Sequence, residues 1–181
     1  SYFEGKSFAG AISLFISISA IALLLPRAIS LNQLPTLANF VHNPAELAQR
    51  TRPMRSQIRL SNILTTLTCI VIGAIVLIQT KERIAGEQLA LCLLLITLQS
   101  TASIQSLVNS NILMAAEKSR LLLKINTITS IVFLSTTMLL YFFLIKNVFL
   151  YLCIAMLVLN LYRLHKTRLY AKPFYDSHPT L

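Results

Sequence analysis

Arg27 is the first arginine in the sequence and a candidate to hold a charged ligand. It follows a long apolar run and stands between two prolines, Pro26 and Pro35. A guanidinium presents a fork of N–H donors that matches the oxygens of a phosphate or carboxylate. If this arginine faces a water-filled cavity and not lipid, we expect an anionic group to bind there.

Two polar stripes interrupt apolar segments further along the chain. One contains Gln99, Ser103 and Ser106 at helical spacing, and the other contains Asn126 and Ser130. Facing stripes on neighbouring helices suit a tight bundle held by interhelical hydrogen bonds, and equally the wall of a hydrophilic passage. Small residues at every fourth position, typical of closely packed membrane helices, favour the first alternative: Ala102, Ser106 and Ser110.

No motif of an enzyme or a metal centre accompanies these stripes. The sequence lacks HExxH, Gly-x-Ser-x-Gly, P-loop and paired-carboxylate patterns, and its three histidines have no partners at ligand spacing. We therefore expect no catalytic residue, no metal site and no cofactor. The three cysteines lie singly in apolar runs, where we expect small packing residues and no disulfide framework: Cys69, Cys92 and Cys153.

The composition is that of a membrane protein. Of 181 residues, 55% are hydrophobic and 12% are charged, whereas soluble domains carry about 25% charged residues. The net charge is +10, but the basic residues flank apolar runs and form no single face, so we expect no nucleic-acid partner.

Five apolar segments predict an all-α integral membrane bundle in a single domain, residues 1–181. They cover about Phe8–Leu25, Asn62–Gln79, Leu89–Val108, Leu121–Ile145 and Val148–Leu161. A span needs about 20 residues. The first segment has a second possible register, about Ser17–Thr36, which would bring Arg27 near the middle of the membrane.

The basic residues predict the orientation of the spans. Twelve of the 16 lysines and arginines lie in alternate connections: five in residues 26–60, three in 109–124 and four in the tail, residues 162–181. Because cytoplasmic loops are enriched in Lys and Arg, we expect the N-terminus outside and the C-terminus in the cytoplasm. All acidic residues fall in connections, which disfavours a carboxylate relay within the spans.

The segment after Phe40 predicts a short cytoplasmic helix. Asn43 is a good N-cap, Pro44 suits the first turn and Glu46 completes a capping box. We expect a break or kink within residues 26–35 before it. Residues 41–60 then form a basic surface segment whose arginines contact lipid head groups: Arg50, Arg52, Arg55 and Arg59.

The beginning of the chain predicts that more sequence precedes it. The chain starts with Ser1 and shows no signal peptide before the first apolar run. An external N-terminus with an odd number of spans is simplest if earlier helices deliver Ser1 to the outer side. We therefore expect the chain to be the second part of a longer one.

Two stretches carry a resemblance to a known family. "LPTLANFVHNPAELAQRTRPMRSQIRL" and "LQSTASIQSLVNSNILMAAEKSRLLLKINTITSIVFL" resemble polysaccharide flippases of the multidrug/oligosaccharidyl-lipid/polysaccharide exporter superfamily. The likeness lies in a Pro-containing turn after a span, a short acidic helix start and a basic helix that enters the next span. The order and orientation also resemble the last five helices of that twelve-helix architecture. Few glycines and an Asn-rich turn at residues 109–111 depart from the family.

The resemblance implies a transporter that moves lipid-linked saccharides across the bacterial cytoplasmic membrane by alternating access. Basic cavity residues would hold the phosphate of the lipid, and Arg27 is the candidate that can reach such a cavity. The remaining residues that we expect at the substrate are Gln99, Ser103, Ser106, Asn126 and Ser130. The alternative is a non-catalytic accessory or assembly subunit of a larger membrane complex, in which the polar stripes only join helices and Arg27 anchors an interface.

Overall fold

The computed structural model describes residues 10, 13, 17, 20, 23–40, 42–79, 83–142 and 148–176. These residues are helical almost throughout and contain no strand, so the all-α prediction is confirmed. The helices are α2 (Leu24–Phe40), α3 (Pro44–Gln79), α4 (Arg83–Ala115), α5 (Ser119–Phe142), α6 (Val148–Ala171) and the short α7 (Pro173–Asp176).

Four helices are long and apolar enough to cross a membrane. The candidate spans are Ala45–Ile75, Glu87–Ala115, Ser119–Leu140 and Val148–Ala171, which supports a membrane protein. They correspond to the second to fifth predicted segments. Most of the first predicted segment, Phe8–Leu25, lies outside the described residues.

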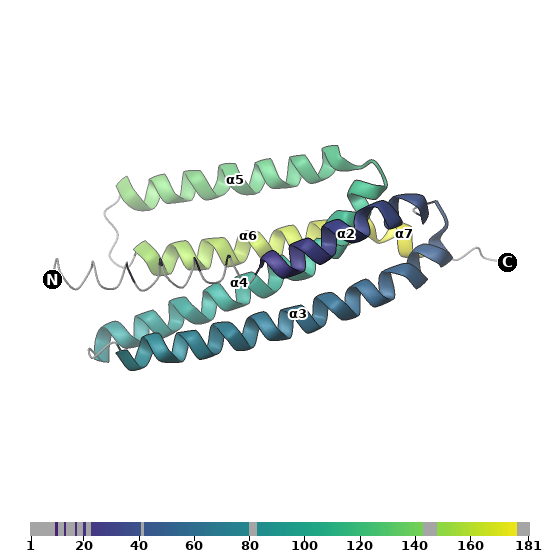
Figure 1. Ribbon diagram of the computed structural model, residues 1–181. Helices are drawn as coiled ribbons and strands as arrows, with labels where there is room; N and C mark the ends of the chain where they lie inside the picture. Colours follow the sequence, from purple (N-terminus) through teal and green to yellow (C-terminus); the bar gives the residue numbers. More distant parts are fainter. Residues whose placement is uncertain are drawn as a thin grey trace.

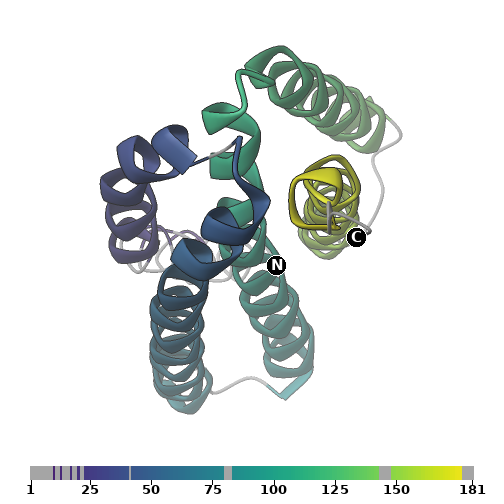
Figure 2. The ribbon, with the colours of Figure 1, turned by 90° about the vertical axis from the view of Figure 1, so that its right-hand side faces the viewer.

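Helix α4 occupies the middle of the bundle. It packs most extensively against α6 and also against α2 and α3, whereas α5 contacts mainly α6. Figure 2 looks along the bundle and shows α2 and α3 on one side of α4, with α5 and α6 on the other. Figure 1 shows that the long helices lie roughly alongside one another.

Two apolar clusters form the core at different heights of the bundle. The Leu37 cluster joins α2, α3, α4 and the end of α6, and consists of Leu37, Leu47, Met54, Ile58, Ile104, Val108, Ile112, Leu113, Ala115 and Ala171. The Cys92 cluster joins α3, α4 and α6, and consists of Cys69, Leu89, Cys92, Leu93, Ile96 and Cys153. All three cysteines thus meet in one cluster, although each stands alone in the sequence.

A polar layer separates the two clusters. Helices α3, α4 and α6 each contribute residues to both clusters. On each of them, polar residues lie in the stretch of sequence between the residues of one cluster and those of the other. We define the polar layer as Ser61, Asn62 and Thr65 on α3, Gln99, Ser100 and Ser103 on α4, and Asn160 and Arg163 on α6. Polar groups therefore lie between the two apolar clusters along each of these helices.

Helix α2 does not break at its prolines. It continues from Leu24 to Phe40 with Pro35 inside, so the helix does not break within residues 26–35, whereas a kink there stays a prediction. Pro26 lies in the first turn, where the missing N–H has no helical acceptor in any case. Pro35 removes one further bond, the one to the carbonyl of Leu31. The chain turns only after Phe40.

The start of α3 was predicted correctly, but its length was not. The Asn43 side-chain oxygen accepts a hydrogen bond from the Glu46 N–H at 3.4 Å, and the Asn43 carbonyl accepts from Leu47 at 2.9 Å. The helix then runs for 36 residues without ending near residue 60. The reason is a buried seam that recurs every three or four residues across that point: Leu47, Thr51, Met54, Ile58, Ser61, Thr65 and Cys69.

The long helices are longer than the hydrocarbon layer of a membrane is thick. At 1.5 Å per residue α3 is about 54 Å long, compared with about 30 Å for the hydrocarbon. Helix α6 likewise continues past the predicted Leu161 to Ala171. The beginning of the predicted tail is therefore folded: α7 packs against α3, and Phe174 contacts the Leu37 cluster. Residues 177–181 lie outside the described part of the chain.

Candidate functional site

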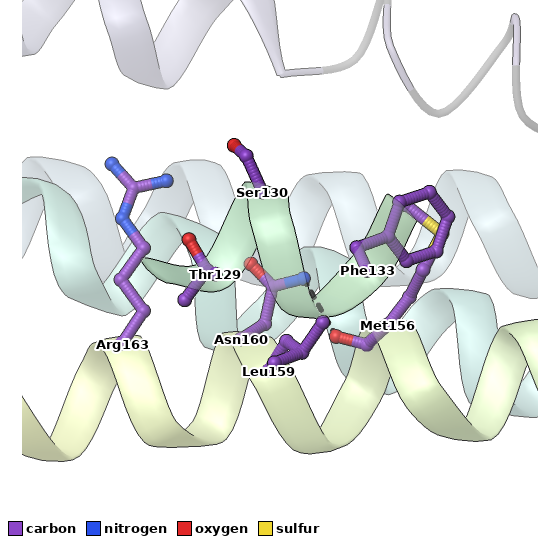
Figure 3. A pocket seen from close by; sticks show the side chains of 7 residues that line it. All are labelled: Thr129, Ser130, Phe133, Met156, Leu159, Asn160 and Arg163. Carbon is purple, nitrogen blue, oxygen red and sulfur yellow. Dashed lines mark hydrogen bonds between the residues drawn. The ribbon is translucent and has the colours of Figure 1, made fainter. Parts of the chain in front are cut away.

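A pocket of about 170 Å³ lies between α5 and α6 (Figure 3). Its lining residues come from α5 (Thr129, Ser130 and Phe133) and from α6 (Met156, Leu159, Asn160 and Arg163). The lining changes in character along the pocket. Figure 3 shows the guanidinium at one end, hydroxyl and amide groups in the middle, and the phenyl ring and the thioether at the other end. Such a gradient suits an amphipathic ligand with a negative charge.

Helical spacing explains why these residues meet. Asn160 and Arg163 stand three positions apart and Met156 four positions before Asn160, so all three share one face of α6. Thr129 and Phe133 are spaced in the same way on α5. The Asn160 amide donates to the Met156 carbonyl at 2.9 Å, and the Thr129 hydroxyl donates to the Asn126 carbonyl at 2.8 Å. These bonds hold both polar side chains against their own helices.

Arg163 is the charged group of the pocket. Its side chain is half-buried, and its Nε atom is buried without a hydrogen-bond partner in the described part of the chain. The guanidinium is partly removed from water and lies close enough to Arg27 for the two positive charges to repel each other. A desolvated cation without a counter-charge is unfavourable, so the arrangement favours an anionic ligand.

The residues predicted at the substrate are only partly brought together. Ser130 lines the pocket, and Asn126 is half-buried one turn away on α5. Arg27 is exposed in the first turn of α2 and is near Arg163. The α4 residues Gln99, Ser103 and Ser106 do not line the pocket.

The two predicted polar stripes do not face each other. Helix α5 packs on α6, and α4 makes only a small contact with α5. Ala102, Ser106 and Ser110 are buried in helix contacts. The hydroxyl of Ser106 donates to the Ser103 carbonyl at 2.7 Å, and that of Ser110 to the Ser106 carbonyl at 2.8 Å. This geometry favours helix packing as the role of the α4 stripe.

The arginines of the basic segment lie on the surface of α3. Arg50, Arg52, Arg55 and Arg59 are all exposed. Arg50 stacks over the Phe40 ring at 5.2 Å from its centroid, a cation–π contact that joins the start of α3 to the end of α2. Contact of this surface with lipid head groups stays a prediction.

Asn160 and Arg163 were missed as site residues. The sequence indicated a span that ends at Leu161, which assigned Arg163 to the basic tail. The signal that could have identified them is a polar pair three residues apart, which places an amide and a guanidinium on one helix face directly after an apolar run.

The cysteines of the Cys92 cluster form the other chemically distinctive group. None of the three forms a disulfide in the structure, and all three are buried; the Cys92 and Cys153 thiols lie close enough to interact with each other. In the described ranges no group of His, Cys, Asp or Glu is arranged to hold a metal ion. The thiols therefore act as packing groups that join α4 and α6.

Comparison with known proteins gives no match: no protein-family model, no curated protein and no solved structure is similar to the chain. The function must therefore be argued from the site itself. The flippase resemblance remains a hypothesis that supplies one way to use such a site.

Proposed function

We propose that the chain is part of a transporter that moves lipid-linked saccharides across the bacterial cytoplasmic membrane by alternating access. Arg163, with Arg27 nearby, would hold the phosphate of the lipid carrier. The observation that carries this proposal is the half-buried Arg163 guanidinium at one end of the pocket, whose Nε atom has no hydrogen-bond partner in the described part of the chain and whose charge is within electrostatic range of Arg27. Repulsion between the two cations is relieved when an anion lies between them.

The size and lining of the pocket support a phosphate that is attached to a hydrocarbon chain. Drug-sized ligands occupy pockets of about 300–1,000 Å³, so a volume of about 170 Å³ is too small for a complete saccharide. It suits a phosphate at Arg163 and the first carbons of a chain at Phe133 and Met156. The sugar would then lie outside this pocket, on the side where Ser130 is exposed.

The position of Arg163 along α6 suits a lipid phosphate that is being carried across the membrane. Arg163 lies about 22 Å from Val148 along the helix at 1.5 Å per residue, within a hydrocarbon layer of about 30 Å. With the basic end of the bundle in the cytoplasm, the guanidinium is in the inner half of the membrane. Arg52, Arg55 and Arg59 then contact anionic head groups, at about 1 kcal/mol each.

The accessory-subunit function is kept as a second candidate because of the apolar surfaces of α5 and α6. Only 11% of the most apolar stretch of α5, and 6% of that of α6, is buried. Lipid covers such surfaces in a transporter, and neighbouring subunits cover them in a complex. In the second case Arg27 and Arg163 anchor an interface and bind no substrate.

Saccharide export separates the two functions. Arg163→Gln and Arg27→Gln are expected to reduce export strongly at normal membrane levels, and Arg27→Lys to retain part of it as a point charge. Lys166→Gln is the matched control, because this cation lies one turn further along α6 and contacts the Tyr162 ring. If export is unchanged while detergent extraction shows a loosened complex, the accessory function is correct.

A further inference from the structure

A buried hydrogen bond joins α2 to the centre of the bundle. The side-chain amide of Asn111 on α4 donates to the backbone carbonyl of Ser30 on α2. Both residues are only 2% exposed. Asn111 directly precedes the fully buried Ile112 and Leu113 of the Leu37 cluster, and a buried amide there would be costly without a hydrogen-bond partner. An amide at this position therefore has a more specific role than filling space.

The bond is made to the part of α2 that carries Arg27. Ser30 lies three residues, or about one helical turn, after Arg27. Pro26, on the other side of Arg27, is fully buried. The next carbonyl, that of Leu31, has lost its helical donor because Pro35 has no N–H. This turn of α2 is thus weakened within its own helix and is held from outside by α4.

We infer that Asn111 is a positioning residue for Arg27, an inference that rests on the proposed anion site. The Arg27 side chain is exposed, so the place of its charge depends on where its backbone is held. Apolar contacts between α2 and α4 allow the helices to slide by small distances, whereas a hydrogen bond is directional and fixes one register. By fixing Ser30, Asn111 keeps the charge of Arg27 close to Arg163.

Anion binding by the full chain tests this role. The purified protein in phosphatidylcholine nanodiscs is titrated with dodecyl phosphate, as wild type, Asn111→Leu, Arg27→Gln and the double variant. We expect Asn111→Leu to weaken binding roughly tenfold, which corresponds to about 1.4 kcal/mol, and to have no further effect when Arg27 is already glutamine. Ser110→Ala is the matched control, because this buried neighbour bonds only within α4, and it should leave the affinity unchanged.

The design separates positioning from a general effect on folding. Equal weakening by Asn111→Leu in the presence and absence of Arg27, or no weakening at all, overturns the inference. Asn111→Gln keeps an amide donor and should recover part of the affinity. If Asn111→Leu does not yield folded protein, Asn111→Ala is used in its place, alone and combined with Arg27→Gln, because it removes the same donor without added bulk. If wild-type protein binds no dodecyl phosphate, the anion site itself is refuted, whereas failure of Asn111→Leu alone leaves that site standing.

Discussion

The Arg163 side chain is placed where it should lower the stability of the ligand-free protein. Its Nε atom has no hydrogen-bond partner in the part of the chain that the structure describes, and Arg27 adds a repulsive charge. An ionisable residue within a membrane span is by default a candidate for a functional site. The free protein and the ligand-bound protein should therefore respond in opposite ways when this cation is removed.

Arg163→Met is expected to raise the melting temperature of the ligand-free protein, with a gain of about 0.5–2 kcal/mol, the size that single stabilising substitutions commonly give. Dodecyl phosphate at 100 times its dissociation constant should stabilise the wild type by about 2.7 kcal/mol and should not stabilise the variant. Thermal melting in nanodiscs measures both effects. A variant that melts lower without ligand would show that Arg163 is a structural residue.

The helices are the level at which the sequence was most informative. Apolar runs located α3 to α6, and Asn43 with Pro44 located the start of α3, because caps and spans depend on local sequence. The length of α3 was missed because its many basic residues hid the continuous buried seam. The end of α6 was missed because the sequence becomes less apolar after Leu161, while the helix continues and buries Thr167 and Ala171. The pocket was only partly predictable, since the pairing of α5 with α6 depends on contacts between distant residues.

The turn between α4 and α5 offers a test of the helix ends. Glu117 has a φ of 57°, and the N–H groups of Lys118 and Glu117 donate to the carbonyls of Leu113 and Met114 at 2.8 and 3.1 Å. This is a Schellman motif with Glu where glycine is usual. Glu117→Gly should stabilise the protein by about 0.5–1 kcal/mol, as measured by thermal melting. Glu117→Ala retains a Cβ, and an equal gain from it would show that the backbone conformation is not the cause.

At the level of the whole bundle, the polar layer separates one end, which contains the Leu37 cluster, from the other, which contains the Cys92 cluster. The Cys92 cluster holds α3, α4 and α6 together, and the Leu37 cluster holds the end that carries most of the basic residues. This division places the arginines of α3 and the α4–α5 turn at the same end. The packing of α4 on α6 and the side on which the basic end lies can each be measured.

Oxidative cross-linking tests the packing of α4 on α6. Because the Cys92 and Cys153 thiols lie in one cluster and close enough to interact, a membrane-permeant oxidant such as diamide should join them. Trypsin cleavage at Lys118 in the α4–α5 turn should then give fragments that separate on a gel only after reduction. Cys92→Ser should abolish the link and Cys69→Ala should not. Fragments that separate without reduction would contradict this helix arrangement.

Thiol labelling tests the orientation. The native cysteines are buried, so single cysteines introduced at the exposed Glu87 and Lys118, near opposite ends of α4, should be the groups that react. A membrane-impermeant reagent added to intact cells should label Glu87→Cys, and label Lys118→Cys only after the membrane is opened. The reverse pattern would place the basic end outside, against the distribution of lysines and arginines.

Binding of a charged amphiphile compared with a neutral one tests the anion site most directly. The purified chain in phosphatidylcholine nanodiscs is titrated with dodecyl phosphate and with dodecyl maltoside, which has the same alkyl chain but no charge. We expect only the phosphate to bind with measurable affinity, and its affinity to fall at least roughly tenfold in Arg163→Gln, as for the loss of a charge-assisted contact of about 1.5–3 kcal/mol. Equal binding of the two amphiphiles, or an unchanged phosphate affinity in Arg163→Gln, would contradict a phosphate site between α5 and α6.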